Sequence, residues 1–294
     1  MSVIAFGSIK ASPGVTTTVL ALASVWSSER SLLIVEADPD GGDLAVRVGL
    51  HPEPGLTSLA AAGRRSATAA QGDQHVQRLP GGPRALLGPP DAEQAIRALE
   101  MIGDGLGLSG REDRDVLIDC GRLRPQSPAA TFVAQAEIVV IVARPRLDEL
   151  QHLRARVDQL TASGAQVRLL LVGDKPYPPD EVAHALAVPI LGVLPVDPAA
   201  AAILNGLGGR RTRLERSPLL RHARDIVEAL AADPAGDSHG PRERSVSAQP
   251  DLTTRREVRE PSVSAGEQPA RSGWAAALTR GSSPTPADTA RTDR

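Results

Sequence analysis

The stretch Gly7-Ser8-Ile9-Lys10-Ala11-Ser12-Pro13-Gly14-Val15-Thr16-Thr17-Thr18 has the outline of a loop that binds phosphate. In the pattern G-x-x-x-x-G-K-[ST], backbone N–H groups surround phosphate, the lysine reaches the outer phosphates and the hydroxyl residue ligates magnesium. We assign Gly7 and Gly14 to the two glycines and Thr16 to the hydroxyl residue, whereas Val15 stands at the lysine position. An ordinary turn between a strand and a helix remains the alternative interpretation.

Lysine is nearly absent from this chain, yet one lysine lies inside the loop. Of 33 Lys and Arg residues, only Lys10 and Lys175 are lysine. Read as K-x-x-x-G-x-T-T, the segment resembles the deviant Walker A loop K-G-G-x-G-K-T-T of the MinD/ParA family of P-loop ATPases, with Lys10 at the signature lysine. The resemblance implies a homodimer in which this lysine crosses to the partner's nucleotide. It also implies ATP and Mg²⁺ as cofactors, with the nucleotide bound by Gly7, Lys10, Gly14, Val15, Thr16 and Thr17.

Two acidic segments follow in the order that this resemblance requires. Residues 31–38 form a short apolar run ending in acids, typical of a buried parallel strand, and they resemble the family's D-x-D-P-Q segment. Glu36 then stands at its first aspartate, and Asp38 at the second, where the family orients the attacking water. Residues 115–121 are similar to the family's Walker B strand. This similarity implies that Asp119 contacts magnesium through a water molecule and that Thr16 is a direct metal ligand.

Each acidic residue also has a simpler explanation. Taken alone, Glu36 and Asp38 are better interpreted as caps of the helix that follows them, because carboxylates favour a helix N-terminus. Asp119 is equally well interpreted as a turn residue. The order of all these motifs along the chain nevertheless favours the family resemblance. The resemblance implies that Lys10 and Asp38 are the catalytic residues.

Strands and helices alternate along the first 232 residues. We expect strands over residues 2–7, 31–38, 115–121, 137–143, 167–172 and 188–194. We expect helices over residues 16–28, 43–49, 56–62, 92–101, 129–136, 147–163, 179–186 and 219–231 and near residue 199; strands within residues 63–90 stay open. This alternation predicts an α/β fold, a mostly parallel twisted sheet with helices on both faces and ligand-binding loops at one edge.

Two later segments bear on recognition of the nucleotide base. Residues 167–174 fall where the family has a strand ending in an asparagine that reads adenine, but Gly173 and Asp174 stand there. Lys175 is interpreted as a solvated loop residue. Residues 189–197 resemble the family's late strand and its G-x-[IL]-P-x-D turn beside the base, so the resemblance covers residues 1–232.

Composition restricts the location and partners. A net charge of -2 argues against strong nonspecific DNA binding, and the arginines at 210, 211, 213 and 216 are interpreted as an exposed loop, with DNA contact as a minor alternative. The single Cys120 cannot form an internal disulfide and is expected to be a core residue in a reducing compartment. No run approaches the roughly 20 apolar residues of a membrane span, and the N-terminus resembles no signal peptide, so we expect a cytoplasmic protein.

The character of the chain changes at residue 233. We divide it into a MinD/ParA-like domain, residues 1–232, and a Pro/Ser/Arg-rich tail, residues 233–294, which is too polar to bury a core and is expected to be disordered. The apolar island from Trp274 to Leu278 either has no role, docks on a protein partner or makes a weak peripheral membrane contact. The excess of arginine over lysine is typical of a GC-rich genome and of a divergent, actinobacterial-like family member.

The missing loop lysine decides the expected chemistry. Losing one electrostatic contact to a transition state commonly costs about two to three orders of magnitude in rate, so we expect weak nucleotide binding and little ATPase turnover. The resemblance then implies a pseudo-ATPase that positions or scaffolds other machinery, such as Tad-type secretion or pilus machinery or partitioning chromosomes. The alternative is an active ATP-dependent dimerisation switch in which Lys10 replaces the missing charge.

Overall fold

The structure is a computed structural model that describes residues 2–10, 12–26, 31–63, 72–103 and 114–232. These residues form a single eight-stranded sheet with the strand order β3-β4-β2-β5-β1-β6-β7-β8. The strands are β1 (Val3–Ser8), β2 (Ser31–Glu36), β3 (Gln77–Arg78), β4 (Arg84–Leu86), β5 (Arg114–Arg122), β6 (Ile138–Ala143), β7 (Gln166–Val172) and β8 (Ile190–Leu194).

Helices connect most of these strands. They are α1 (Val15–Val25), α2 (Leu44–Val48), α3 (Leu56–Gly63), the 3-10 helix η1 (Asp73–His75), α5 (Ala92–Ile102), α6 (Ala130–Gln135), α7 (Leu147–Ala162), α8 (Pro179–Leu186), α9 (Pro198–Leu204), α10 (Arg211–Glu215) and α11 (Pro218–Ala232). Local chemistry fixes several starts. The Asp91 carboxylate accepts a hydrogen bond from the Gln94 N–H and caps α5, and prolines occupy the first turns of α8 and α9.

The register of the central strands determines where a ligand can bind. Phe6 of β1 pairs with Asp119 of β5 on one side and with Val140 of β6 on the other. Glu36 of β2 pairs with Asp119 from the opposite side of β5. Because β1, β5 and β2 are parallel neighbours, their carboxyl ends meet at one edge of the sheet, and the loops that follow them converge there.

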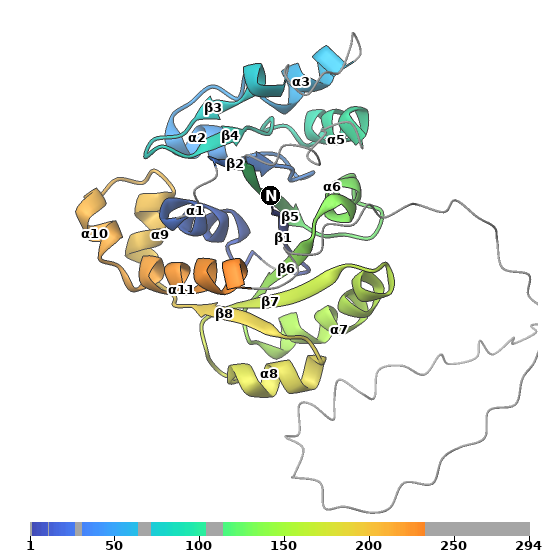
Figure 1. Cartoon of the computed structure of the whole chain (residues 1–294), viewed down its shortest axis with the longest axis vertical. Coiled ribbons are helices and arrows are strands. Elements are labelled where there is room, and N and C mark those ends of the chain that lie inside the picture. Colours follow the sequence, from blue (N-terminus) through green and yellow to red (C-terminus); the bar gives the residue numbers. More distant parts are fainter. Residues whose placement is uncertain (1, 11, 27–30, 64–71, 104–113, 233–294) are drawn as a thin grey trace, which may run out of the picture. The chain divides into compact units, whose positions relative to one another are not determined.

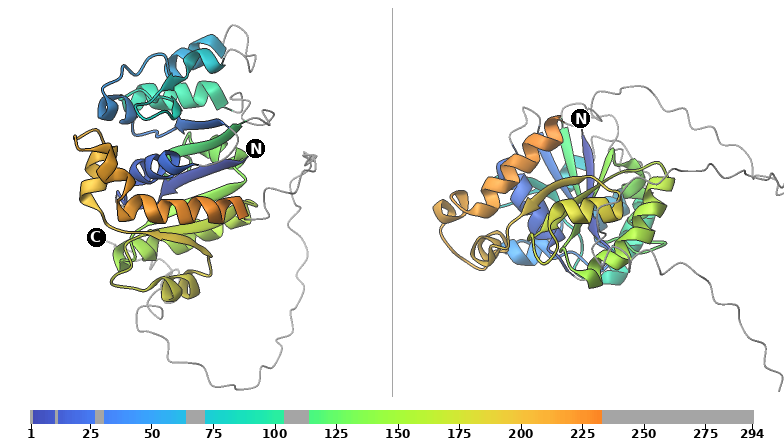
Figure 2. Two further views of the ribbon diagram at one scale, coloured as in Figure 1. Left: turned by 60° about the vertical axis from the view of Figure 1, so that its left-hand side comes forward. Right: turned by 90° about the horizontal axis from the view of Figure 1, so that it is seen from below.

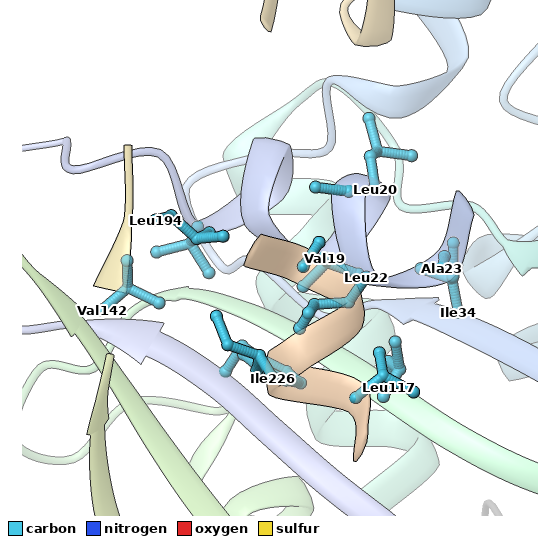
Figure 3. Packing of buried hydrophobic residues seen from close by; sticks show 14 of the residues in the cluster. Val19, Leu20, Leu22, Ala23, Ile34, Leu117, Val142, Leu194 and Ile226 are labelled. Atoms are coloured by element: carbon cyan, nitrogen blue, oxygen red, sulfur yellow. The ribbon is translucent and has the colours of Figure 1, made fainter. Parts of the chain in front are cut away.

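The core is built mainly from aliphatic side chains on both faces of the sheet, together with the buried Phe6 and Phe132. Helices α1 and α11 lie side by side on one face, and α6 and α7 lie on the other (Figures 1 and 2). Under α1 and α11, Leu22, Leu117 and Ile226 pack together with the side chains of β6 and β8 (Figure 3). Successive residues of β1 are all buried, because both faces of this central strand are covered.

The predicted α/β architecture is confirmed, including the parallel sheet and the helices on both faces. Residues 63–90, for which no strand was predicted, contain β3 and β4, and β3 is antiparallel to β4 at the sheet edge. The arginine-rich segment before α11 was predicted to be an exposed loop, but part of it forms the short helix α10. Within α10, Arg211 forms an ion pair with Glu215 one turn later. The predicted tail and its island at residues 274–278 lie outside the described residues, as do residues 27 and 28 of the predicted first helix.

Gly192 of β8 tests the packing of α11. A Cβ atom at this position would lie 2.5 Å from Cγ1 of the buried Ile226, and overpacking of this kind typically costs about 1–3 kcal/mol. We expect Gly192→Ala to lower the free energy of unfolding by that amount in urea denaturation. Gly63→Ala is the matched control, since a Cβ atom there meets nothing within 4 Å; equal effects of the two substitutions would contradict this account of the interface.

Candidate functional site

The loop after β1 leads directly into the N-terminus of α1. Gly14 is the N-cap of α1 and has a φ of 101°, a left-handed conformation that glycine adopts without strain. It carries no capping side chain, and the first turn of α1 holds no acidic residue. Gly14, Val15, Thr16 and Thr17 contribute to the lining of a pocket of about 170 Å³. A pocket at a helix N-terminus suits an anion, because the first N–H groups of a helix have no partner within it.

The size of this pocket suits phosphate groups more than a whole nucleotide. Pockets that enclose drug-sized ligands have volumes of about 300–1,000 Å³, larger than the 170 Å³ found here. Val15 lines the pocket, but its side chain is only 7% exposed and belongs to the hydrophobic core cluster. The position assigned to a phosphate-binding lysine is therefore occupied by a core residue.

Gly7 lies apart from this pocket. It is within β1, where a Cβ atom would collide with the Leu123 side chain. Six residues separate Gly7 from Gly14, two more than the phosphate-binding pattern has between its glycines, and Ile9 stands at the pattern's first glycine position. The close packing against Leu123 is a sufficient reason for a glycine here.

Thr16 and Asp119 are the two residues predicted to lie at magnesium, and the structure brings them close together. Oδ1 of the Asp119 carboxylate accepts the Gly121 N–H at 3.0 Å. Burial raises the pKa of Asp119, and the nearby Thr16 hydroxyl opposes this shift. Within the described ranges, no group of three or more His, Cys, Asp or Glu side chains is arranged to hold a metal. A hydroxyl and one carboxylate fit Mg²⁺ all the same, because Mg²⁺ usually keeps several waters and binds substrate phosphates.

The Glu36 carboxylate is a structural cap. Its Oε1 accepts the backbone N–H groups of Asp43 and Leu44 at 2.7 and 2.8 Å, and its Oε2 accepts the Gly88 N–H at 2.9 Å. Burial raises the pKa of Glu36 to about 7 despite these three hydrogen bonds. The simpler interpretation of Glu36, as a cap of the helix that follows, describes these contacts.

Asp38 lies beyond the end of β2 and lines the pocket. Its Oδ1 accepts the Asp40 N–H at 2.9 Å, and its carboxyl group packs so closely against Gly121 that no side chain fits there. Burial is the main reason that the pKa of Asp38 is raised to about 6, and the nearby Asp119 adds to the shift. The carboxylates of Asp38 and Asp119 are thus brought to one site, although hydrolysis by this site remains a prediction.

Lys10 lies outside the pocket lining. Its side chain is exposed, and Nζ lies 2.8 Å from Nε2 of His152 on α7. Arg144 also contacts this loop, since its Nη2 donates to the Ser12 carbonyl at 3.1 Å. Neither cation faces the phosphate pocket of its own chain in this arrangement.

The residues predicted to border a base lie at the ends of β7 and β8. Asp174 and Lys175 are exposed in the loop after β7. Asp197 accepts the Ala200 N–H and caps α9, and the turn around it lines a separate hollow of about 510 Å³. Cys120 is buried in β5, and burial raises the pKa of its thiol, as expected of a core residue.

The structure adds functional candidates that sequence reasoning missed. Arg47 of α2 and Arg122 at the end of β5 both line the phosphate pocket. Asn205, which follows α9, joins Arg47 to Thr17. A pattern search could not find Arg47, because a single arginine in a short helix carries no motif and its direction depends on how α2 is anchored.

The sequence matches no protein-family model and no curated protein. Among solved structures, the cell division ATPase MinD of Pyrococcus furiosus gives a TM-score of 0.64 at 21% identity, covering 78% of this chain and 98% of that chain. The septum site-determining protein MinD of Pyrococcus horikoshii, complexed with Mg-ADP, gives a TM-score of 0.64 at 22% identity and covers 80% of this chain and 98% of that chain. A ParA family ATPase from Chlorobium tepidum gives a TM-score of 0.66 at 18% identity and covers 77% of this chain and 98% of that chain. The chain therefore has the fold of the MinD/ParA-type P-loop ATPases.

The raised pKa of Asp38 predicts a pH-dependent stability. The pKa of Asp38 is about 6 in the folded chain, against the ordinary value of 3.8 that we take for the unfolded chain. The folded state therefore binds the proton more tightly, and the free energy of unfolding falls as the pH rises from about 4 to 6. Asp38→Asn removes this loss, so we expect it to be more stable than the wild type by about 1–2 kcal/mol above pH 7, given about 1.4 kcal/mol per pKa unit and partial solvent screening.

Urea denaturation between pH 4 and pH 8 measures this difference. Asp148→Asn is a control for which we expect the opposite change in stability, because Arg146 lowers the pKa of Asp148. Loss of this carboxylate should destabilise the protein near neutral pH and not in acid. A difference between Asp38→Asn and wild type that stays constant with pH would contradict the assignment.

Proposed function

We propose that this chain is a MinD/ParA-type spatial-organisation or scaffolding protein whose nucleotide binding is weak and whose ATP hydrolysis is slow or absent. The observation that carries the proposal is a site with the Thr16–Asp119 pair intact and the buried Val15 at the lysine position. The fold supports it, since the MinD and ParA structures that it resembles are described as cell division, septum site-determining and ParA family proteins.

The balance of charge around the pocket supports weak binding. The pocket is lined by three carboxylates, those of Asp38, Asp40 and Asp43, which disfavour an anion. In addition, Pro13 removes one backbone N–H from the loop. Phosphoryl transfer depends mainly on positioned positive charge and on magnesium. Mg²⁺ held by Thr16 and Asp119 would supply part of that charge, and Asp38 is the candidate to orient water.

The mode of action that we propose is dimerisation and recruitment of a protein partner. The tail segment from Trp274 to Leu278 is our candidate for the recruiting peptide or for a peripheral membrane contact, in a cytoplasmic protein. Secretion or pilus machinery and chromosome partitioning are the candidate processes. None of the helices in the described part of the chain has the length and apolarity of a membrane span. Arg210, Arg211, Arg213 and Arg216 are exposed and remain the candidate for a minor DNA contact.

An active ATP-dependent switch is the second candidate function, and the exposure of Lys10 favours it. A lysine whose ammonium lies at the surface, outside its own pocket, is able to act in a neighbouring subunit. In that case ATP would hold two copies together through Lys10.

Calorimetry on the full chain tests the proposed weak site. We expect Mg-ATP to bind detectably but weakly, with turnover about two to three orders of magnitude slower than with a lysine in the loop. Val15→Lys is expected to raise the Mg-ATP affinity at least tenfold, although it places a charge where a core side chain packed, so thermal unfolding is measured alongside. Brisk hydrolysis by the wild type would overturn the proposal.

The mass of the protein in solution, with and without Mg-ATP, separates the two candidate functions. If the switch operates, Lys10→Ala abolishes ATP-dependent dimerisation; if the protein is a scaffold, this substitution changes the mass little. Lys175→Ala is the matched control, because it removes the other lysine from an exposed loop. Loss of dimerisation in both variants would assign the effect to net charge and contradict a specific role of Lys10.

A further inference from the structure

Arg47 occupies a part of the phosphate pocket that the loop lysine leaves without charge. It is the fourth residue of α2, its side chain is 24% exposed, and it lines the pocket together with Gly14, Thr16 and Thr17. We propose that the Arg47 guanidinium binds the phosphate chain of a nucleotide in this pocket and supplies the positive charge that Val15 lacks. This inference rests on the proposed nucleotide-binding function of the site.

The position of α2 is fixed from both ends. At its N-terminus the Glu36 carboxylate accepts the Asp43 and Leu44 N–H groups. At its C-terminal end the Arg47 carbonyl packs against Gly206 so closely that a Cβ atom there would overlap it, and Gly206 has a φ of 73°. Arg47 therefore projects from a backbone that is held on the sheet and on the segment after α9.

The guanidinium itself is oriented by two hydrogen bonds. Nη1 donates to Oδ1 of Asn205, and Nη2 donates to Oδ2 of Asp43 at 2.9 Å. The Asn205 amide lies 3.3 Å from the Thr17 hydroxyl on the first turn of α1, so Arg47 is tied to the phosphate loop through one intermediate side chain. These bonds use two of the five N–H groups of a guanidinium, and the others remain to bind an anion.

The charge of Arg47 already acts on the metal side of the site. Its positive charge lowers the pKa of Asp119, which burial otherwise raises. A guanidinium stays protonated and matches two phosphate oxygens at once. Arg47 would therefore stabilise the negative charge of the phosphates from the α2 side of the pocket.

Two other cations near the loop are less well placed for this role. Lys10 and Arg144 do not line the pocket, and each is held by another contact, Lys10 at His152 and Arg144 at the Ser12 carbonyl. Arg122, at the end of β5, also lines the pocket and is the alternative cation. We favour Arg47 because its guanidinium is bonded to Asn205, which contacts Thr17 in the first turn of α1.

Calorimetric titration of the full chain with Mg-ATP tests this inference. We expect Arg47→Ala to weaken binding at least tenfold, Arg47→Lys to restore part of the affinity, and the loss to be larger for ATP than for AMP. Arg97→Ala is the matched control, since Arg97 also forms an ion pair one helical turn away, with Glu93, but lies on the exposed side of α5. Thermal unfolding of each variant shows whether it is folded.

A second comparison separates binding of phosphate from a structural role in holding α2. In the Val15→Lys background a lysine supplies the loop charge, so Arg47→Ala should then weaken Mg-ATP binding by much less than it does in the wild type. An equal loss in both backgrounds, or an affinity that falls with Arg122→Ala and not with Arg47→Ala, would overturn the inference. Wild-type protein that does not bind Mg-ATP at all would instead overturn the proposed function, whereas binding that Arg47→Ala leaves unchanged would overturn this inference alone.

Discussion

The buried carboxylate of Glu36 is the contact on which the arrangement of the candidate site depends. It accepts backbone N–H groups from the start of α2 and from Gly88, after β4, and so fastens two loops to the end of β2. Its environment leaves room for nothing larger, since a Cβ atom on Gly42 would lie 2.5 Å from Oε2. Removing either hydrogen-bonding oxygen would leave buried N–H groups without partners, a cost of about 1–3 kcal/mol each.

The candidate site keeps the two residues predicted to lie at magnesium but not the lysine predicted to reach phosphate. The Thr16 hydroxyl lies near the buried Asp119 carboxylate, which the parallel register of β1 and β5 brings about. On the other side the lysine position has become part of the hydrophobic core through Val15. A positive charge removed from a phosphate site is costly unless another takes its place, and this is why the placement of Arg47 matters for the chemistry.

Most of the fold was predictable because it follows from local patterns. Short apolar runs alternating with helical segments indicated the parallel strands and the helices that connect them. The elements that were left open or predicted wrongly fall where local patterns carry little information. The edge strands β3 and β4 are only two and three residues long, so no periodicity is visible in them, and α10 is a five-residue helix that reads as a polar arginine-rich loop.

The sequence by itself determined the α/β class and the order of the elements, because these depend on residue type and spacing along the chain. It also placed Asp38 near the site, since a residue after a parallel strand must lie at the sheet edge. The tertiary structure alone decided that Lys10 turns toward His152, that Glu36 serves as a cap and that Arg47 enters the pocket. These outcomes depend on contacts between segments far apart in the chain, and no local pattern encodes the direction of a side chain relative to a distant helix.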